Sequence, residues 1–180
     1  MRPSRPPLAT LARARGQSAI EFAMAAPFIV LLLLGSLDLT FFFADTMTGG
    51  SAARVGSRLA SEIGGGQGGM TTPQADALIV KSVLAASSGL NDASLKEIDV
   101  YTPGSSDGQY SSTDPADVFD GAGNPVAGKQ TFPLSARLQK VPNETSIGVR
   151  VVWQFVPPMG VGTGLLTFNQ YTVFKAEALP

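Results

Sequence analysis

The side chains that could do chemistry in this chain are mainly carboxylates, because fourteen residues are acidic while histidine and cysteine are absent. The commonest general base, the thiol nucleophile and the thiolate metal ligand are therefore all missing. The sequence also contains no G-x-S-x-G motif and no carboxylate pair in a defined setting. We therefore expect no enzymatic activity, no catalytic residue and no cofactor.

Four aspartates within the polar segment 103–129 raise the question of a calcium site. They are Asp107, Asp114, Asp117 and Asp120. Their spacing does not match the EF-hand loop, in which ligands fall at alternate positions and a glutamate closes the site. A solvated loop is the stronger interpretation, so we predict no metal site. A loop of this length in a compact domain is usually functional or disordered, and it is a candidate contact surface.

Glu21 is the most unusual carboxylate, because it stands at the start of a long apolar run. Phe22 to Leu37 are sixteen residues without a charge, and the run continues from Asp38 to Ala44. A membrane-spanning helix needs about 20 mostly apolar residues, so this segment is long enough to span. A carboxylate drawn into hydrocarbon costs about 3 kcal/mol, so Glu21 calls for a functional reason.

Asp38 is the second carboxylate in the run, and two interpretations stay open. It could lie at the outer interface, where a carboxylate costs little, or be buried among packed helices beside a basic residue of a partner.

The residues before the span are basic and contain no acidic side chain. Arg2, Arg5, Arg13 and Arg15 all precede Ile20. Arginine beside a span stays on the cytoplasmic side, so we expect a cytoplasmic N-terminus and an exported remainder. Residues 1–16 are interpreted as a removable leader, with a disordered basic tail as the alternative. Residues after Gly16 carry nine basic and fourteen acidic side chains, a charge of −5, which argues against a nucleic-acid partner.

The junction between leader and span resembles a known processing site. Gly16-Gln17-Ser18-Ala19-Ile20-Glu21-Phe22 is similar to the site of type IVb prepilins, where a peptidase cuts after glycine. The longer segment resembles the TadE-like family of pseudopilins and minor pilins from tight-adherence (Flp) pilus systems. The shared features are the glycine, a Glu-Phe pair, a proline, a late acidic residue and an Ala-Ala-Arg-x-Gly-x-Arg segment. Here these are Gly16, Glu21-Phe22, Pro27, Asp38 and residues 52–58.

The resemblance covers about a third of the chain, from Gly16 to Ala60, and it implies several roles. Gly16 and Gln17 would form the processing site, and Glu21 would offset the new amine of a neighbouring Gln17. Glu21, Phe22 and Asp38 would make contacts between subunits. The implied partners are other pilin or pilus-assembly subunits, a prepilin peptidase and the membrane. The implied location is the inner membrane as a single-pass protein, with the extracellular pilus as a further destination.

Beyond the span, apolar periodicity predicts how the rest of the chain folds. One helical face carries Ala52, Val55, Gly56, Leu59 and Ile63, which favours a helix over 17–63. Gly49-Gly50 is its weak point, since glycine inside a helix costs about 1 kcal/mol relative to alanine. Residues 64–72 then read as a glycine-rich linker.

The exported part, residues 73–180, is predicted to combine a short helix with a small antiparallel sheet. Thr72 would cap the helix and Pro73 would begin it. The expected buried positions are Ile79, Val83, Ala86 and Leu90 on the helix, Ile98 and Val100 on a strand over 96–102, and Ile147, Val149, Val151, Trp153 and Phe155 on a later strand. Phe168 to Leu179 would supply its partner strand. The predicted class is α+β and pilin-like by analogy, and we expect residues 73–180 to fold without the long helix.

Two functions of different classes follow from the sequence. The first is a membrane-anchored minor pilin or pseudopilin that takes part in assembly of a tight-adherence pilus. The second is a single-pass anchored, or signal-cleaved, exported binding module whose 103–129 segment contacts a ligand.

Overall fold

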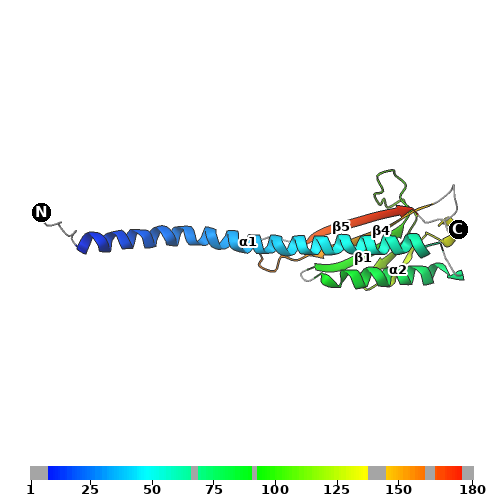
Figure 1. Cartoon of the computed structure of the whole chain (residues 1–180), viewed down its shortest axis with the longest axis horizontal. Coiled ribbons are helices and arrows are strands. Elements are labelled where there is room, and N and C mark those ends of the chain that lie inside the picture. The colour runs from blue at the N-terminus through cyan, green and yellow to red at the C-terminus, as the bar shows by residue number, and fades with distance from the viewer. Residues whose placement is uncertain (1–7, 66–68, 91–92, 138–144, 161–164, 176–180) are drawn as a thin grey trace.

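A computed structural model describes residues 8–65, 69–90, 93–137, 145–160 and 165–175, and it shows an α+β protein with a protruding helix (Figure 1). The helical elements are α1 (Leu8–Ile63), α2 (Thr72–Ala86), η2 (Ser87–Gly89) and η3 (Leu134–Ala136). The strands are β1 (Ala93–Tyr101), β2 (Ala116–Asp120), β3 (Pro125–Gln130), β4 (Ser146–Phe155) and β5 (Leu166–Lys175). The predicted class, a long helix, a short helix and an antiparallel sheet, is confirmed.

The sheet has the strand order β3-β2-β1-β4-β5, and every neighbouring pair is antiparallel. Its helix-facing side holds the alternating apolar residues that the sequence predicted on β1 and β4, and all of them are buried. The C-terminal half of α1 packs on β4 and β5, and α2 lies beside it. The core therefore sits between two helices and one face of the sheet.

The helix α1 continues through Gly49-Gly50, where the sequence predicted a weak point, and it also contains Pro27. Gly49 is buried against Trp153, and a Cβ atom there would stand 2.8 Å from the indole nitrogen. Packing therefore requires a residue without a side chain at Gly49, and the intrinsic cost of glycine is offset by tertiary contacts.

The buried face of α1 consists of small residues, and this differs from the predicted face. Val55 was expected to point inward, but it is 43% exposed. Ala52 and Gly56 are buried as predicted, and Ala53, Ser57, Ala60 and Ser61 are buried beside them. Leu59 and Ile63 are only partly buried. A Cβ atom on Gly56 would lie 2.4 Å from Cγ2 of Val83 and 3.1 Å from Cγ1 of Val149. Small residues are needed because α1 approaches both α2 and β4 closely.

Ser57 ties α1 to the strands beneath it. Its hydroxyl accepts a hydrogen bond from the Val149 amide of β4 at 3.2 Å and lies within hydrogen-bond distance of the Thr172 carbonyl of β5. Val149 and Thr172 are register partners in the sheet. One buried helix side chain therefore satisfies backbone groups of two strands, which fixes both the height and the rotation of α1.

The second helix begins one residue earlier than predicted, because Thr71 and not Thr72 is the capping residue. Thr71 is the residue before the helix, and its amide donates to the Gln74 side chain at 2.9 Å. Thr72 is the first helical residue, and its hydroxyl accepts from the Leu134 amide at 3.2 Å. The predicted buried positions Ile79 and Val83 are confirmed. Ala86 and Leu90 pack at the margin of the core.

The segment 103–129 is not the single long loop that its composition indicated. It contains all of β2 and most of β3, which extend the sheet beyond β1. The composition misled because β2 is short and carries Asp117 and Asp120, while its Phe119 is buried. The connection between β1 and β2 is correspondingly shorter, and Tyr101 holds it by donating a hydrogen bond to the Gly108 carbonyl at 2.7 Å.

The long helix and the sheet share one core, which bears on the expectation that residues 73–180 fold alone. Ala52, Ala53 and Ala60 of α1 are completely buried against that core. Residues 64 and 65 form a turn after α1, and the Gly64 amide donates to the Ala60 carbonyl at 2.8 Å. The glycine-rich segment therefore connects two parts of one packing unit, contrary to the expected decoupling.

Candidate functional site

The N-terminal half of α1 forms an apolar surface that the rest of the described chain leaves uncovered. Its exposed large side chains are Ile20, Phe22, Met24, Phe28, Ile29, Val30, Leu31, Leu32, Leu33, Leu37, Leu39 and Phe43. Within the described residues, this is the one helix long and apolar enough to cross a membrane, and none of its most apolar window is buried. Such a surface requires a lipid or protein partner.

Glu21 lies on this surface one helical turn from Gln17. The Gln17 side-chain amide donates a hydrogen bond to the Glu21 carboxylate at 3.1 Å. Both residues are exposed, as is Phe22 next to them. Gly16 belongs to the same helix. The backbone thus brings Gln17 and Glu21 together, while Asp38 lies far along the helix from both.

Asp38 is covered by its own chain. Its carboxylate accepts a hydrogen bond from the Met159 amide, which lies in the connection between β4 and β5, at 2.9 Å. The carboxylate lies where the exposed half of α1 meets the folded domain. This position agrees with the interpretation that placed Asp38 at the outer membrane interface. Its burial comes from an intrachain contact, which neither interpretation included.

A shallow groove of about 320 Å³ surrounds Asp38. Its lining residues are Gly35, Asp38, Leu39, Phe42, Phe155, Pro157, Leu166 and Phe168. Phe42 anchors α1 here, because its ring lies 4.9 Å from that of Phe168 and 5.6 Å from that of Phe155. Trp153 stacks on Phe168 at 5.0 Å and is a core residue, as predicted. These aromatic contacts hold the end of β4 and the start of β5 against the helix.

A buried ionic cluster, which the sequence did not predict, joins α2 to β2. Arg137 donates to both oxygens of Asp76 on α2, at 2.6 and 3.1 Å, and to Asp117 on β2 at 2.7 Å. Its Nε also donates to the Phe132 carbonyl at 3.0 Å. All three charged residues are almost completely buried. The two carboxylates come from positions far apart in sequence, so no local pattern signals the cluster.

The cluster carries two carboxylates for one guanidinium, and this imbalance affects its titration. Burial raises the pKa of Asp76 from 3.8 to about 6, although the Arg137 contact opposes the shift and Asp117 adds to it.

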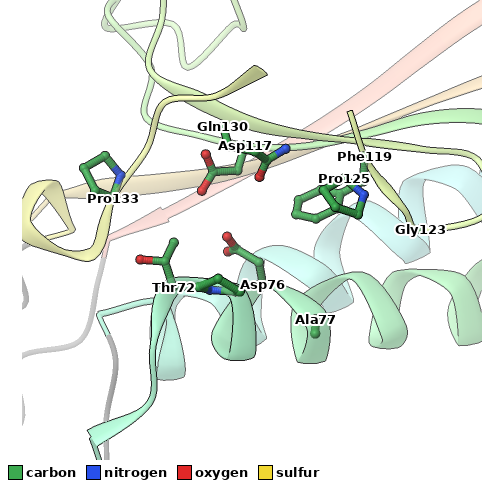
Figure 2. A pocket seen from close by; sticks show the side chains of 10 residues that line it. Thr72, Asp76, Ala77, Asp117, Phe119, Gly123, Pro125, Gln130 and Pro133 are labelled. Atoms are coloured by element: carbon green, nitrogen blue, oxygen red, sulfur yellow. The ribbon is translucent and has the colours of Figure 1, made fainter. Parts of the chain in front are cut away.

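A cavity of about 530 Å³ lies over this cluster, between α2 and the β2–β3 pair (Figure 2). Its walls include Thr72, Pro73, Asp76, Ala77, Asp117, Phe119, Gly123, Pro125, Gln130 and Pro133. Figure 2 shows the carboxylates of Asp76 and Asp117 facing each other across the cavity, with Pro133 on one side of them and Pro125 and Phe119 on the other. An apolar cavity with a few convergent polar groups is the usual form of a binding site.

The opposite face of the sheet carries a second ionic cluster. Arg150 pairs with Glu97 and Asp99, and its guanidinium lies 4.1 Å from the centre of the Tyr110 ring. Burial raises the pKa of Asp99 from 3.8 to about 6, against the opposing effect of Arg150. Tyr110 also meets Tyr101 edge-on at 5.2 Å. This cluster holds the β1–β2 connection over the sheet.

The four aspartates of the 103–129 segment do not converge in the structure. Asp107, Asp114 and Asp120 accept hydrogen bonds from nearby backbone amides in three separate turns. Asp117 pairs with Arg137. Among the described residues, no group of three or more acidic side chains could hold a metal ion. Each carboxylate thus stabilises its own part of the chain.

These features define a class of protein: an α+β domain built around the second half of one long helix, with the first half exposed as a candidate membrane anchor. The family comparison then narrows that class. Residues 16–58 match the family model described as TadE-like protein. This segment is therefore TadE-like, and the resemblance seen in the sequence is confirmed over that range. It begins at Gly16, contains Glu21 and Asp38, and ends at Arg58.

Comparisons with curated proteins and with solved structures gave no match. The TadE-like segment together with the candidate membrane helix fits a membrane protein associated with a tight-adherence pilus.

Proposed function

We propose that this chain is a membrane-anchored minor pilin or pseudopilin that takes part in assembly of a tight-adherence (Flp, type IVb) pilus. The observation that carries the proposal is the division of one continuous helix, α1. Its first half exposes an apolar surface within the TadE-like segment, and its second half is built into the folded domain. Such a helix serves as a membrane anchor before assembly and as a packing surface between subunits afterwards.

The proposal assigns a direction to the chain in the inner membrane. The four arginines before Gly16 favour a cytoplasmic N-terminus, so the α+β domain is exported. A prepilin peptidase then cuts between Gly16 and Gln17. Gly16 suits this step because a residue without a side chain permits close approach of the enzyme to the backbone. The mature chain starts at Gln17, one helical turn before Glu21.

In the proposed assembly, Glu21 and Phe22 contact a neighbouring subunit. The mature Gln17 amine carries a positive charge that the Glu21 carboxylate of a neighbour offsets. This interaction is favourable in surroundings of low dielectric constant, where unpaired charges are expensive. Within one chain Glu21 already accepts a hydrogen bond from the Gln17 side chain, which supports a pairing of these two positions.

The decisive experiment measures the mass of the protein in cells that make the cognate peptidase. We expect the wild-type chain to begin at Gln17, and Gly16→Val to retain the sixteen leader residues while it remains in the membrane. Ala19→Val is the matched control, because it introduces the same side chain three residues away, and it should be processed normally. A wild-type chain that still begins at Met1 would reduce the protein to a plain membrane-anchored domain.

A second candidate function is supported by the cavity over Asp76 and Asp117. In this alternative the exported domain is a binding module, and the residues of 103–129 that contact the ligand are those of the β2–β3 pair that line the cavity. Its apolar walls and acidic inner end suit an apolar group with a cationic end. A photoactivatable side chain at Ala77, on the exposed rim, should then form an adduct with a second exported protein. The same side chain at Ser88, exposed in η2 beyond the far end of α2, should not.

A further inference from the structure

The end of the domain nearest the exposed half of α1 has an unusual surface. There Met159, which follows β4, bonds to Asp38 of α1. In Figure 1 this is the part of α1 where the protruding helix meets the folded domain. The described residues at this end include Val156, Met159, Leu165 and Leu166, and all four have exposed side chains. Leu166 lines the groove that contains Asp38, Val156 stands in the sequence between two other lining residues, Phe155 and Pro157, and Met159 bonds to Asp38. This set of four is called the basal apolar surface below.

The chain around the basal apolar surface contains no acidic or basic residue. Between Arg150 and Lys175 lie twenty-four consecutive uncharged residues, although 15% of the whole chain is charged. A solvated connection between strands normally gains solubility from charged side chains. The missing charge and the exposed apolar side chains are two observations that agree, and both fit contact with lipid.

The length of the helix leads to the same conclusion. At 1.5 Å per residue, a hydrocarbon core of about 30 Å corresponds to about 20 residues of helix. A span that starts directly after Glu21 therefore ends near Phe41. Asp38 lies three residues before that end, which is about 5 Å inside the apolar layer. The Met159 amide, bonded to Asp38 at 2.9 Å, must lie at the same depth.

Asp38 can lie at this depth because its own chain hydrogen-bonds to it and shields it. A carboxylate near the edge of the hydrocarbon is costly unless protein groups hydrogen-bond to it. Here the Met159 amide supplies a hydrogen bond, and the folded domain shields the side chain from its surroundings. Met159, in the described part of the β4–β5 connection, therefore has to accompany Asp38 into the membrane boundary.

We propose that the basal apolar surface inserts into the lipid leaflet on the exported side, beside α1, so that the domain contacts the membrane at a second place. The partner is the boundary between headgroups and acyl chains, where apolar groups bury to a depth of about 5–10 Å. The inference rests on the proposed anchoring of α1. The inference adds to that function that the exported domain contacts the bilayer surface before assembly.

The test uses single-cysteine variants of the full chain, because the sequence contains no cysteine to interfere. Met159→Cys and Leu166→Cys place an environment-sensitive fluorophore on the surface. Phe174→Cys is the matched control, since Leu166 and Phe174 lie on the same strand and are 49% and 42% exposed. Leu31→Cys, in the middle of the apolar run, reports whether α1 spans at all. Each labelled chain is placed in vesicles of phosphatidylcholine and phosphatidylglycerol with nitroxides at shallow or deep positions.

We expect shallow nitroxides to quench the fluorophores at positions 159 and 166 several times more strongly than the one at 174. Deep nitroxides should quench position 31. Strong quenching at 31 with none at 159 and 166 would overturn the inference while leaving the anchor intact. A blue-shifted fluorophore at 159 or 166 that nitroxide lipids do not reach would mean that a second copy covers the surface, and would also overturn it. Loss of quenching at 31 would refute the anchor and the inference together.

Unchanged Trp153 fluorescence shows that the labelled variants are folded, because this single tryptophan is buried in the core. Leader processing after Gly16 is measured separately, so a failure of the pilin assignment leaves the quenching result interpretable.

Discussion

Gly49 of α1 lies against the indole ring of Trp153 on β4, so closely that a Cβ atom on the glycine would stand 2.8 Å from the indole nitrogen. Gly50, the next residue, has far more room, because a Cβ atom there would meet only the Gln170 side chain, at 3.9 Å. Two adjacent glycines in one helix therefore have different physical roles.

This difference predicts substitutions of opposite sign. Gly49→Ala should lower the free energy of unfolding, since overpacking a core typically costs about 1–3 kcal/mol and the helical gain is only about 1 kcal/mol. Gly50→Ala should raise it by up to about 1 kcal/mol, because it gains helix propensity without a clash. Urea unfolding of the detergent-solubilised chain, followed by Trp153 fluorescence, measures both. Equal effects at the two positions would contradict the packing argument.

Gly56→Ala should be more damaging than Gly49→Ala. Its methyl group would meet Cγ2 of Val83 at 2.4 Å and Cγ1 of Val149 at 3.1 Å, so two elements must move. Adding Val83→Ala to Gly56→Ala should restore part of the loss, because it removes the nearer clash. The free energies of unfolding of the two single variants and the double variant test this coupling. Strictly additive effects would show that the clash with Val83 is not the cause.

The shared core predicts which fragments fold. A fragment covering 69–180 lacks α1 and leaves the helix-facing side of β4 and β5 uncovered, so we expect no cooperative thermal unfolding. A fragment covering 45–180 keeps the buried small-residue face of α1 without the apolar run, and it should unfold cooperatively. Differential scanning calorimetry distinguishes the two. Cooperative unfolding of the shorter fragment would instead support the expectation from the sequence that residues 73–180 are independent.

Stability should depend on pH through two buried carboxyl groups. The pKa values of Asp76 and Asp99 are raised from 3.8 to about 6 in the folded protein. Between about pH 4 and pH 6 the folded state therefore binds more protons than the unfolded state, and the free energy of unfolding falls as the pH rises. This contribution is fully present below about pH 4 and is lost as the pH rises through about 6.

Asparagine at either position should flatten this part of the pH profile. Asp76→Asn leaves Arg137 paired with Asp117, and Asp99→Asn leaves Arg150 paired with Glu97. The free energy of unfolding, measured by urea at several pH values, gives the slopes. Asp107→Asn serves as the control, because hydrogen bonds from Ser105 and the Gln109 amide lower the pKa of Asp107, so its effect falls at more acidic pH. Unchanged slopes in both core variants would refute the assignment.

Glu21→Ala should separate processing from assembly. The substitution makes the apolar run more hydrophobic, so insertion is retained and cleavage after Gly16 should continue. Assembly should fail if Glu21 pairs with the amine of a neighbouring Gln17. The processed mass and the amount of protein in sheared pili measure the two steps. Normal assembly of Glu21→Ala would mean that Glu21 is only an interfacial residue.

The parts of the fold that the sequence predicted are those that depend on apolar periodicity. The alternation on β4 and the stripe on α2 appear where they were expected. The buried face of α1 was harder to predict because close packing selects small residues, whereas periodicity counts large apolar ones. Val55 appeared buried for that reason, while Ser57 was overlooked.

The candidate site was predictable only where a charged side chain lies next to or within an apolar run. Glu21 was identified because it stands at the start of an apolar run, and Asp38 because it interrupts the run. The partner of Asp38 is a backbone amide 121 positions away, and a backbone group leaves no mark in the sequence. Asp117 appeared to belong to a solvated loop because its neutralising partner, Arg137, lies on a different element. Side-chain type indicates that a partner is needed, but only the fold identifies it.

The hydroxyl of Ser57 also sets the direction in which the far end of the helix faces. Glu21 lies thirty-six residues before Ser57, and at 3.6 residues per turn this is about ten whole turns. Glu21 therefore projects from the same azimuth of the rod as Ser57, on the side where the sheet lies. A neighbouring chain that binds Glu21 would then contact the side of the protruding helix that faces in the same direction as the sheet. The contacts of Ser57 with two strands thereby fix the direction in which Glu21 faces the next subunit.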